Sequence, residues 1–131
     1  MQVLITGSRE ASSAMRVKAE EVVRWALDQG HSIIVGDAPG VDRFVRIACS
    51  TAKVPVVVYG AYGTIRDPEL GKHWEVREKI HGTYPNRDLV MASKCDMCVG
   101  IWNGTSRGTK ITFEAARRLG KRVIVRTFKG D

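Results

Sequence analysis

Positions 103 to 114 read Asn-Gly-Thr-Ser-Arg-Gly-Thr-Lys-Ile-Thr-Phe-Glu. These residues follow the apolar run Met97–Trp102 and begin an amphipathic segment. The apolar side chains that recur there at helical spacing are Ile111, Ala115, Ala116 and Leu119. The pattern predicts a strand, a glycine-rich turn and a helix.

The glycine-rich turn has the features of an anion site. The first amides of a helix have no partner within the helix and lie at the positive end of its dipole. Gly104 and Gly108 let a ligand approach the backbone closely. The side chains that add hydroxyl or cationic donors are Thr105, Ser106, Arg107, Thr109 and Lys110. The alternative is a plain connection in which Ser106 caps the helix and the glycines only form the bend.

The bulk properties of the chain restrict its class. With 131 residues and a mass of 14.5 kDa, the chain is expected to form a single domain over residues 1–131. Its formal charge of +7 favours phosphorylated or polyanionic partners over membranes. The chain has three cysteines without a disulfide framework, no apolar run that could span a bilayer, and an opening run typical of a strand. These features predict a cytoplasmic protein.

Four further apolar runs alternate with amphipathic segments and are expected to be strands. They are Gln2–Thr6, Ser32–Val35, Val54–Tyr59 and Arg122–Thr127. Continuous apolar strands separated by helices predict a parallel sheet that is covered on both faces. The expected fold is therefore α/β, a Rossmann-like three-layer sandwich around a five-stranded parallel sheet, most simply ordered 3-2-1-4-5.

The segment Gly60–Thr83 interrupts this alternation because it is polar, aromatic and charged. Asp67 and Pro68 can begin a helix there. The side chains that would share one side of it are Leu70, Trp74, Arg77 and Ile80. The next segment, Thr83–Lys94, is predicted to be a helix with Pro85 near its first turn.

The turns after three strands are expected to meet. In a doubly wound sheet, ligands bind at the carboxyl ends of the strands, where the strand order reverses. The turns placed around that crevice are Gly7-Ser8-Arg9, Gly36–Asp42 and Asn103–Thr109. Arginines that can bind phosphate with bidentate geometry are Arg9, Arg87 and Arg107. Carboxylates that can hold ribose hydroxyls or act as acid or base are Asp37, Asp42 and Asp88. Singly, each of these residues can also be a solvated surface charge or a helix cap.

Other chemical signatures are incomplete. Gly104–Gly108 matches the G-x-S-x-G nucleophile elbow, but all three histidines precede Ser106, which is the wrong order for that triad. Cys95 and Cys98 form a C-x-x-C without a second pair and are interpreted as small apolar residues entering a strand. The histidines lack metal-ligand spacing, and no G-x-x-x-x-G-K-[ST] or G-x-G-x-x-G loop occurs, so neither a metal nor a cofactor is expected.

Four motifs in order resemble the SLOG superfamily of Rossmann-like nucleotide-binding domains. They are Gly7-Ser8-Arg9, Gly36–Asp42, Asn86-Arg87 with Met91 and Asp96, and Gly104–Thr109. The resemblance covers nearly the whole chain except Gly60–Thr83. It implies a nucleotide ligand and a domain that pairs into a homodimer.

One branch of the superfamily is similar around the second half of the chain. Arg87, Met91 and Gly108-Thr109 resemble the cytokinin-activating LOG enzymes, which cleave the N-glycosidic bond of nucleoside monophosphates. The chain departs from the LOG pattern at the catalytic glutamate, because Glu114 lies further along the helix. The resemblance implies catalysis by Arg87 together with a carboxylate, either Glu114 or Asp88.

Another branch is DNA-processing protein A, the Smf family, which binds single-stranded DNA. Its motifs look like Gly7-Ser8-Arg9, Gly36–Asp42 and the helix start Arg107–Thr112. The basic charge of the chain agrees with this branch, because phosphate neutralisation drives such binding. The additional domains of that family are not found in this sequence.

Three hypotheses of function follow. In the first, the chain binds a nucleotide and hydrolyses its N-glycosidic bond. In the second, it is a non-catalytic binder of single-stranded nucleic acid, and in the third it senses or sequesters a signalling nucleotide. The residues expected to bind phosphate or nucleotide are Gly7, Ser8, Arg9, Gly36, Asp37, Ala38, Gly40, Asp42, Asn103, Gly104, Thr105, Ser106, Arg107, Gly108 and Thr109.

Overall fold

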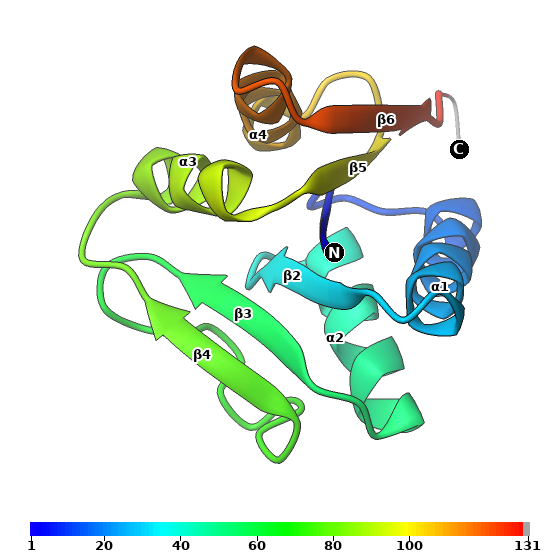
Figure 1. The fold of residues 1–131 in the computed structure, drawn as a ribbon, viewed down its shortest axis with the longest axis vertical. Helices are drawn as coiled ribbons and strands as arrows, with labels where there is room; N and C mark the ends of the chain where they lie inside the picture. Colours follow the sequence, from blue (N-terminus) through cyan, green and yellow to red (C-terminus); the bar gives the residue numbers. More distant parts are fainter. Residues whose placement is uncertain (130–131) are drawn as a thin grey trace.

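The computed structural model describes residues 1–129 and shows one parallel sheet between two layers of helices (Figure 1). The strands in this part of the chain are β1 Gln2–Gly7, β2 Ser32–Gly36, β3 Val56–Gly60, β4 Glu75–Lys79, β5 Met97–Trp102 and β6 Arg122–Thr127. The helices are α1 Ser13–Asp28, α2 Val41–Ala52, α3 Tyr84–Lys94 and α4 Arg107–Arg118. The strand order is β4-β3-β2-β1-β5-β6, so the expected α/β sandwich is confirmed.

The central strands are apolar because both of their faces are covered. Val3 and Ile5 of β1 belong to the apolar cluster formed with α1 and α2, whereas Leu4 belongs to the cluster formed with α3 and α4. This alternation follows from the two-residue period of a strand. Figure 1 shows the two pairs of helices on opposite sides of the sheet. The carboxyl ends of the strands are therefore left to the turns.

One strand was not predicted from the sequence. Glu75–Lys79 forms β4 and pairs with β3 at the edge of the sheet, where a helix beginning near Asp67 was expected. The expected number of five strands was wrong for this reason, whereas the order expected for the other strands is confirmed. Four of the five residues of β4 are charged and its one apolar residue, Val76, is exposed, so the strand has no apolar alternation to reveal it. Charged side chains are common on edge strands because they discourage pairing with other chains.

A buried ion pair holds this edge of the sheet. Arg46 of α2 donates through Nε to Glu75 Oε2 at 2.8 Å, and both side chains are fully buried. The same guanidinium donates to the carbonyl oxygens of Arg66 and Asp67 at 2.9 and 3.0 Å. Arg46 therefore fixes the loop before β4, and that loop carries Arg66 toward the carboxyl ends of the strands.

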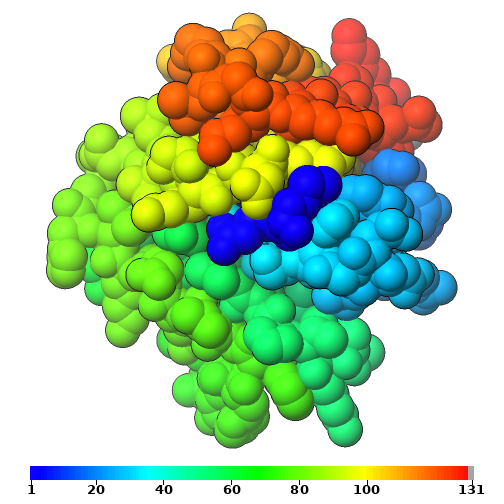
Figure 2. All heavy atoms as spheres, in the orientation of Figure 1, coloured from blue at the N-terminus to red at the C-terminus, as the bar shows by residue number. Residues whose placement is uncertain are grey.

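The amino ends of the central strands are closed by the beginning of the chain. The amide of Gln2 donates to Asp96 Oδ2 at 2.7 Å, and the amide of Ser32 donates to the carbonyl of Met1 at 3.1 Å. Figure 2 shows the first residues, in blue, between the segments that lead into β2, in cyan, and β5, in yellow. The turns that sequence analysis selected lie at the other ends of these strands.

The four helices begin in two different ways. Ser12 caps α1 by accepting from the amide of Met15, and Thr83 caps α3 through a capping box with Asn86. At α2 and α4 no side chain accepts from the first amides. The two helices without a side-chain cap are those that follow the turns after β2 and β5.

The outer faces of the helices carry polar and apolar side chains, among the latter Val17, Trp25 and Ile47. Within residues 1–129 no helix has both the length and the apolar character needed to cross a bilayer. Leu119 was expected on the buried face of α4 but is 54% exposed, because the helix ends at Arg118. Thr112 and Phe113 occupy buried positions on that helix instead.

Candidate functional site

Ser8 joins three turns at the carboxyl ends of the strands. Its hydroxyl accepts a hydrogen bond from the amide of Asn103 at 2.9 Å, and its carbonyl accepts one from the amide of Val41 at 3.1 Å. Gly40 has a φ of 83°, and a Cβ there would overlap the backbone of Ser8 and Arg9. The turns after β1, β2 and β5 are thus in direct contact, in the arrangement that the doubly wound topology dictates.

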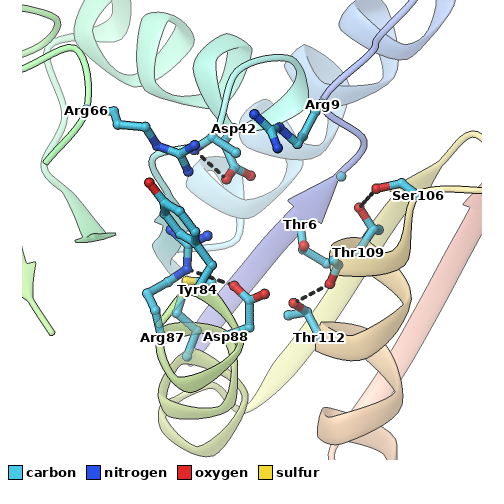
Figure 3. Close-up of a pocket in the computed structure, with 14 residues that line it drawn as sticks. Thr6, Arg9, Asp42, Arg66, Tyr84, Arg87, Asp88, Ser106, Thr109 and Thr112 are labelled. Atoms are coloured by element: carbon cyan, nitrogen blue, oxygen red, sulfur yellow. Dashed lines mark hydrogen bonds and ion pairs between the residues drawn. The ribbon is translucent and has the colours of Figure 1, made fainter. Parts of the chain in front are cut away.

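A cavity of about 170 Å³ opens where these turns meet α3 (Figure 3). The residues that line it are Thr6, Gly7, Arg9, Ala38, Asp42, Arg66, Tyr84, Arg87, Asp88, Met91, Ser106, Gly108, Thr109 and Thr112. Figure 3 shows the labelled residues of α4 on one side, facing Arg66, Tyr84, Arg87 and Asp88 on the other. The two sides differ in chemistry.

The first side, which we call the carboxylate wall, consists of Asp42, Arg66, Arg87 and Asp88. Arg87 donates through Nε to Asp88 Oδ1 at 2.7 Å and through Nη1 to Asp37 Oδ1 at 2.9 Å. Asp37 lies behind the wall and is 2% exposed. It also accepts from the guanidinium of Arg66 at 2.9 Å. The two arginines are therefore held in place by carboxylates before any ligand binds.

The pKa values of the three aspartates diverge because their partners differ. Burial by itself would raise the pKa of Asp37, but hydrogen bonds and charge from Arg66, with the charge of Arg87, hold it below the ordinary value. Burial raises the pKa of Asp88, against the opposing effect of Arg87. Burial raises the pKa of Asp42 to about 7, because the charge of Arg87 and one backbone hydrogen bond compensate only partly. Asp42 is thus the carboxyl group of the site most ready to hold a proton near neutral pH.

The second side, which we call the amide wall, is the beginning of α4 from Ser106 to Thr112. Lys110 is the first residue whose amide donates within the helix, to the carbonyl of Ser106 at 3.4 Å. Among the described residues, no acceptor is found for the amides of Arg107, Gly108 and Thr109. The hydroxyls of Ser106 and Thr109 lie 3.2 Å apart and bond to each other instead of capping the helix. This wall presents neutral donors at the positive end of a helix dipole.

Gly108 borders open space on the cavity side. A Cβ added at this position would meet no protein atom within 4 Å, although Gly108 lines the cavity. Its backbone conformation also lies outside the left-handed region, so alanine fits there without strain. Whatever enters the cavity beside this residue can therefore approach the backbone directly.

The structure distributes the expected site residues over three positions. Those that line the cavity are Gly7, Arg9, Ala38, Asp42, Arg87, Asp88, Ser106, Gly108 and Thr109. Those that support it from behind are Ser8, Gly36, Asp37 and Gly40. Those that do not line it are Asn103, Gly104, Thr105, Arg107 and Glu114. Asn103 has a structural part, because its side chain accepts from the amides of Thr105 and Ser106 and so shapes the turn.

Sequence analysis did not select several residues of the cavity. Arg66 lies in the irregular segment before β4, where no periodicity gave a signal. Tyr84 precedes a proline at the start of α3, and its ring lies 4.3 Å from the guanidinium carbon of Arg66. Thr6 is the penultimate residue of β1 and Thr112 lies on the buried side of α4. The positions of Thr6 and Thr112 beside the glycine-rich turns were a usable signal, whereas that of Arg66 was not.

The described residues contain no cluster of three or more His, Cys, Asp or Glu side chains placed to hold a metal ion. Cys95 and Cys98 are both fully buried, and burial raises the pKa of each thiol, that of Cys98 to about 12. A thiol with so high a pKa is a poor nucleophile. The chemistry of the cavity therefore rests on its carboxylates, arginines and backbone amides.

No protein-family model and no curated protein matches this chain. Solved structures are similar to it, among them TM1055, a target of the Northeast Structural Genomics Consortium. That structure has a TM-score of 0.77 and 24% identity over 93% of this chain and 71% of its own. DNA processing protein A from Helicobacter pylori, described for its single-stranded DNA binding mode, has a TM-score of 0.74 and 15% identity over 95% of this chain and 64% of its own.

The same protein from Streptococcus pneumoniae has a TM-score of 0.80 and 20% identity, and the alignment covers 95% of this chain but 49% of that one. The chain thus spans about two thirds of one of these DNA processing proteins and half of the other. At these levels of identity the likeness concerns the fold. The Rossmann-like fold expected from the sequence is confirmed.

Proposed function

We propose that the protein binds a nucleotide in this cavity, with the phosphate on the amide wall and the ribose between that wall and the carboxylate wall. The observation that carries the proposal is that unpaired amides of one helix and buried carboxylates of two other helices line the same small cavity. Phosphates bind at helix N-termini with free amides. Carboxyl groups beside the sugar can donate or accept a proton.

Arg9 is a better phosphate ligand than Arg87. Arg87 uses Nε and Nη1 for Asp88 and Asp37, and Nη1 also donates to the carbonyl of Tyr59 at 2.9 Å. Only its Nη2 has no partner among the described residues. Arg9 is exposed, lines the cavity and forms no ion pair with residues 1–129. Its guanidinium is therefore available as a counter-charge beside the amides of α4.

The size of the cavity limits how much of the ligand it encloses. Pockets that enclose a whole drug-sized ligand have volumes of roughly 300–1,000 Å³, whereas this cavity has about 170 Å³. It accommodates the phosphorylated sugar, and the base then lies at its opening. Tyr84 lines that cavity and presents an aromatic ring. Recognition is therefore expected to depend more on the ribose phosphate than on the base.

Hydrolysis of the N-glycosidic bond is the activity we propose for the bound nucleotide. It requires a carboxylate near the anomeric carbon to support an oxocarbenium-like transition state. Asp88 meets this requirement because it lines the cavity, whereas Glu114 does not. Arg87 then acts by holding Asp88 in place through the 2.7 Å ion pair.

A second candidate function is binding of single-stranded nucleic acid without catalysis. It is favoured by the similar fold of the Helicobacter protein, which is described as binding single-stranded DNA, and by the net charge of +7. A site for one ribose phosphate and a groove for many phosphates differ in their dependence on salt. That difference is measured directly by titration.

The proposed function is tested with a panel of nucleoside monophosphates and chromatography for free base. We expect wild-type protein to bind a nucleotide and release its base. Asp88→Asn should retain binding and lose release, whereas Gly108→Val should lose both because its side chain fills the phosphate position. No binding of any mononucleotide by wild type would refute the proposal, and oligonucleotide titrations would then test the second candidate. The homodimer remains a prediction, and a measurement of the molecular mass in solution tests it.

A further inference from the structure

Asp42 differs from the other two carboxylates around the cavity in its partners. Asp37 forms ion pairs with Arg66 and Arg87, and Asp88 forms one with Arg87. Asp42 forms no ion pair with any described residue. Its Oδ2 accepts one hydrogen bond, from the amide of Ala38 at 3.2 Å. Asp42 is therefore the carboxyl group that the fold leaves without a cationic partner in contact.

The other oxygen of Asp42 is available to a ligand. The residue is 5% exposed and lines the cavity, yet Oδ1 accepts no hydrogen bond from the described residues. No sealed side-chain nitrogen or oxygen in residues 1–129 lacks a partner. Oδ1 is consequently reached from the cavity rather than enclosed by protein. Figure 3 shows the carboxyl group of Asp42 between Arg9 and Arg66.

Protein closes off one side of the Asp42 carboxyl group. A Cβ added at Gly36 would lie 2.7 Å from Asp42 Oδ2 and 2.8 Å from Arg87 Nη1, so a glycine is needed behind both groups. Asp42 lies in the first turn of α2, and its Oδ2 is the oxygen next to Gly36, the last residue of β2. A group fixed in this way at the edge of a ligand site can transfer a proton with defined geometry.

Charged groups of both signs face Asp42 from the surrounding elements. They are Asp37 at the end of β2, Arg87 and Asp88 on α3, Arg66 in the loop before β4, and Arg9 after β1. Burial is the largest influence on the pKa of Asp42, which rises to about 7, with smaller upward contributions from Asp88 and Asp37 and a downward one from Arg87. The carboxyl group is therefore extensively protonated at and just below neutral pH.

We propose that Asp42 is the general acid of the site and donates its proton from Oδ1 to the departing base. This inference rests on the proposed function and adds the residue that activates the leaving group. Neither the glycine-rich turn nor the LOG-like motif assigns that role. Pairs of carboxyl groups in unlike environments divide acid and base work in this way.

The reaction then balances with water as the second reactant. As the bond between C1′ and the base nitrogen breaks, its electron pair stays on the nitrogen, which takes the proton from Asp42. The oxygen of a water molecule bonds to C1′, and Asp88 accepts the proton that this water loses. The products are the free base and ribose 5-phosphate. Solvent then returns the proton from Asp88 to Asp42.

The pH dependence follows from the two roles. Asp88 must be ionised, so base release rises with pH on the acid side. Asp42 must be protonated, so base release falls as the pH increases through about 7, approaching tenfold per pH unit above that point. The profile is therefore bell-shaped, and its alkaline limb belongs to Asp42.

The test compares wild type, Asp42→Asn and Asp88→Asn in nucleotide binding and base release. Asparagine keeps an oxygen that can accept from the amide of Ala38, so we expect Asp42→Asn to fold and to bind nucleotide within about threefold of wild type. Its base release should fall by roughly 100- to 10,000-fold. The carbon-13 signal of the Asp42 carboxyl in ligand-free wild type should titrate near pH 7, a measurement that does not need the variant to fold.

The outcomes are distinguishable. Base release by Asp42→Asn at the wild-type rate would overturn the role of Asp42 and leave the activity standing. Loss of binding together with turnover would assign Asp42 to ribose recognition and also overturn the inference, as would a carboxyl titration below about pH 5. Nucleotide binding without base release by wild type would overturn the proposed hydrolysis and, with it, the acid role.

Discussion

The two walls of the cavity differ in how much of their hydrogen-bonding capacity is used within the protein. On the carboxylate wall, two arginines and an aspartate are paired with one another or with Asp37, so most of their hydrogen-bonding capacity is used within the protein. On the amide wall, the first amides of α4 are left without acceptors among residues 1–129. The charged wall is thus the rigid one, and the uncharged wall is the one with capacity to bind an anion.

This difference changes the role that is assigned to Arg87. From sequence, Arg87 is an obvious phosphate ligand. In the structure, it is 5% exposed and holds two carboxylates in place. Removing Arg87 therefore tests the integrity of the wall, whereas removing the space beside Gly108 tests binding.

Arg87→Ala should destabilise the protein strongly. The change leaves the buried Asp88 without its ion pair and Asp37 with one arginine instead of two. Breaking a buried pair from one side typically costs about 3–5 kcal/mol, and urea unfolding measures it. Arg107→Ala, which removes an exposed arginine, is the control and should change the free energy of unfolding by less than about 0.5 kcal/mol. Equal effects of the two variants would show that the carboxylate wall is not a structural unit.

Asp42→Asn should become more stable relative to wild type as pH rises. The folded-state pKa of Asp42 is raised from 3.8 to about 7. Its contribution to stability is therefore fully present below pH 3.8 and is lost as pH rises to about 7. The free energy of unfolding of wild type therefore falls by ~4 kcal/mol over this range, whereas that of the variant does not. Urea unfolding of both proteins between pH 4 and 8 measures the difference.

Asp37→Asn is the control of opposite sign in the same experiment. Because the folded-state pKa of Asp37 is lowered, this residue stabilises the protein above its ordinary pKa, and the stabilisation disappears as pH falls. The variant should therefore be less stable than wild type at neutral pH and approach it in acid. A difference between Asp42→Asn and wild type that stays constant with pH would contradict the raised pKa of Asp42.

Two alanine substitutions at the ends of α4 should affect stability in opposite directions. Gly108→Ala adds a Cβ in open space at an unstrained position, so it should leave stability unchanged or raise it by up to ~1 kcal/mol. Gly120→Ala also meets open space, but the φ of 76° at Gly120 is unfavourable for alanine, so stability should fall by about 1 kcal/mol. Thermal unfolding compares them. A destabilised Gly108→Ala would mean that the amide wall is part of the packing.

The smallest expected effect is that of salt concentration on the affinity for a mononucleotide. A ligand whose single phosphate meets one cation, Arg9, should lose only about threefold in affinity between 50 and 200 mM salt. Binding through five or more phosphates would lose roughly a hundredfold over the same range. Titrations of a mononucleotide and an oligonucleotide in parallel measure both slopes. A steep slope with tight oligonucleotide binding would favour the nucleic-acid function.

The sequence was sufficient to predict most of the fold because the decisive signals are local. Apolar runs of strand length, with helical periodicity and glycines between them, predicted five strands and their order. The same glycine-containing turns predicted where one end of the cavity lies. The strand β4 escaped prediction because its residues are charged and its position depends on the buried pair of Glu75 with Arg46 of α2. A pair between distant charged residues leaves no pattern in the sequence.

Arg66 escaped for the same reason, since its loop is fixed by Arg46. The glycine-rich turn was found because it combines glycines, hydroxyls and a helix start within a few residues. Glu114 was selected from its nearness in sequence to that turn, but it lies outside the cavity lining. Local patterns thus revealed the amide wall, whereas the carboxylate wall depends on contacts across 50 residues, as between Asp37 and Arg87.

The most direct test of the central claim is calorimetric titration of ribose 5-phosphate into wild type, Gly108→Ala and Gly120→Ala. If the phosphate lies on the amide wall, Gly108→Ala should bind at least about tenfold more weakly than wild type, while its stability is undiminished. Gly120→Ala should bind like wild type in spite of its lower stability. Equal affinity of wild type and Gly108→Ala would show that the phosphate does not bind at the start of α4.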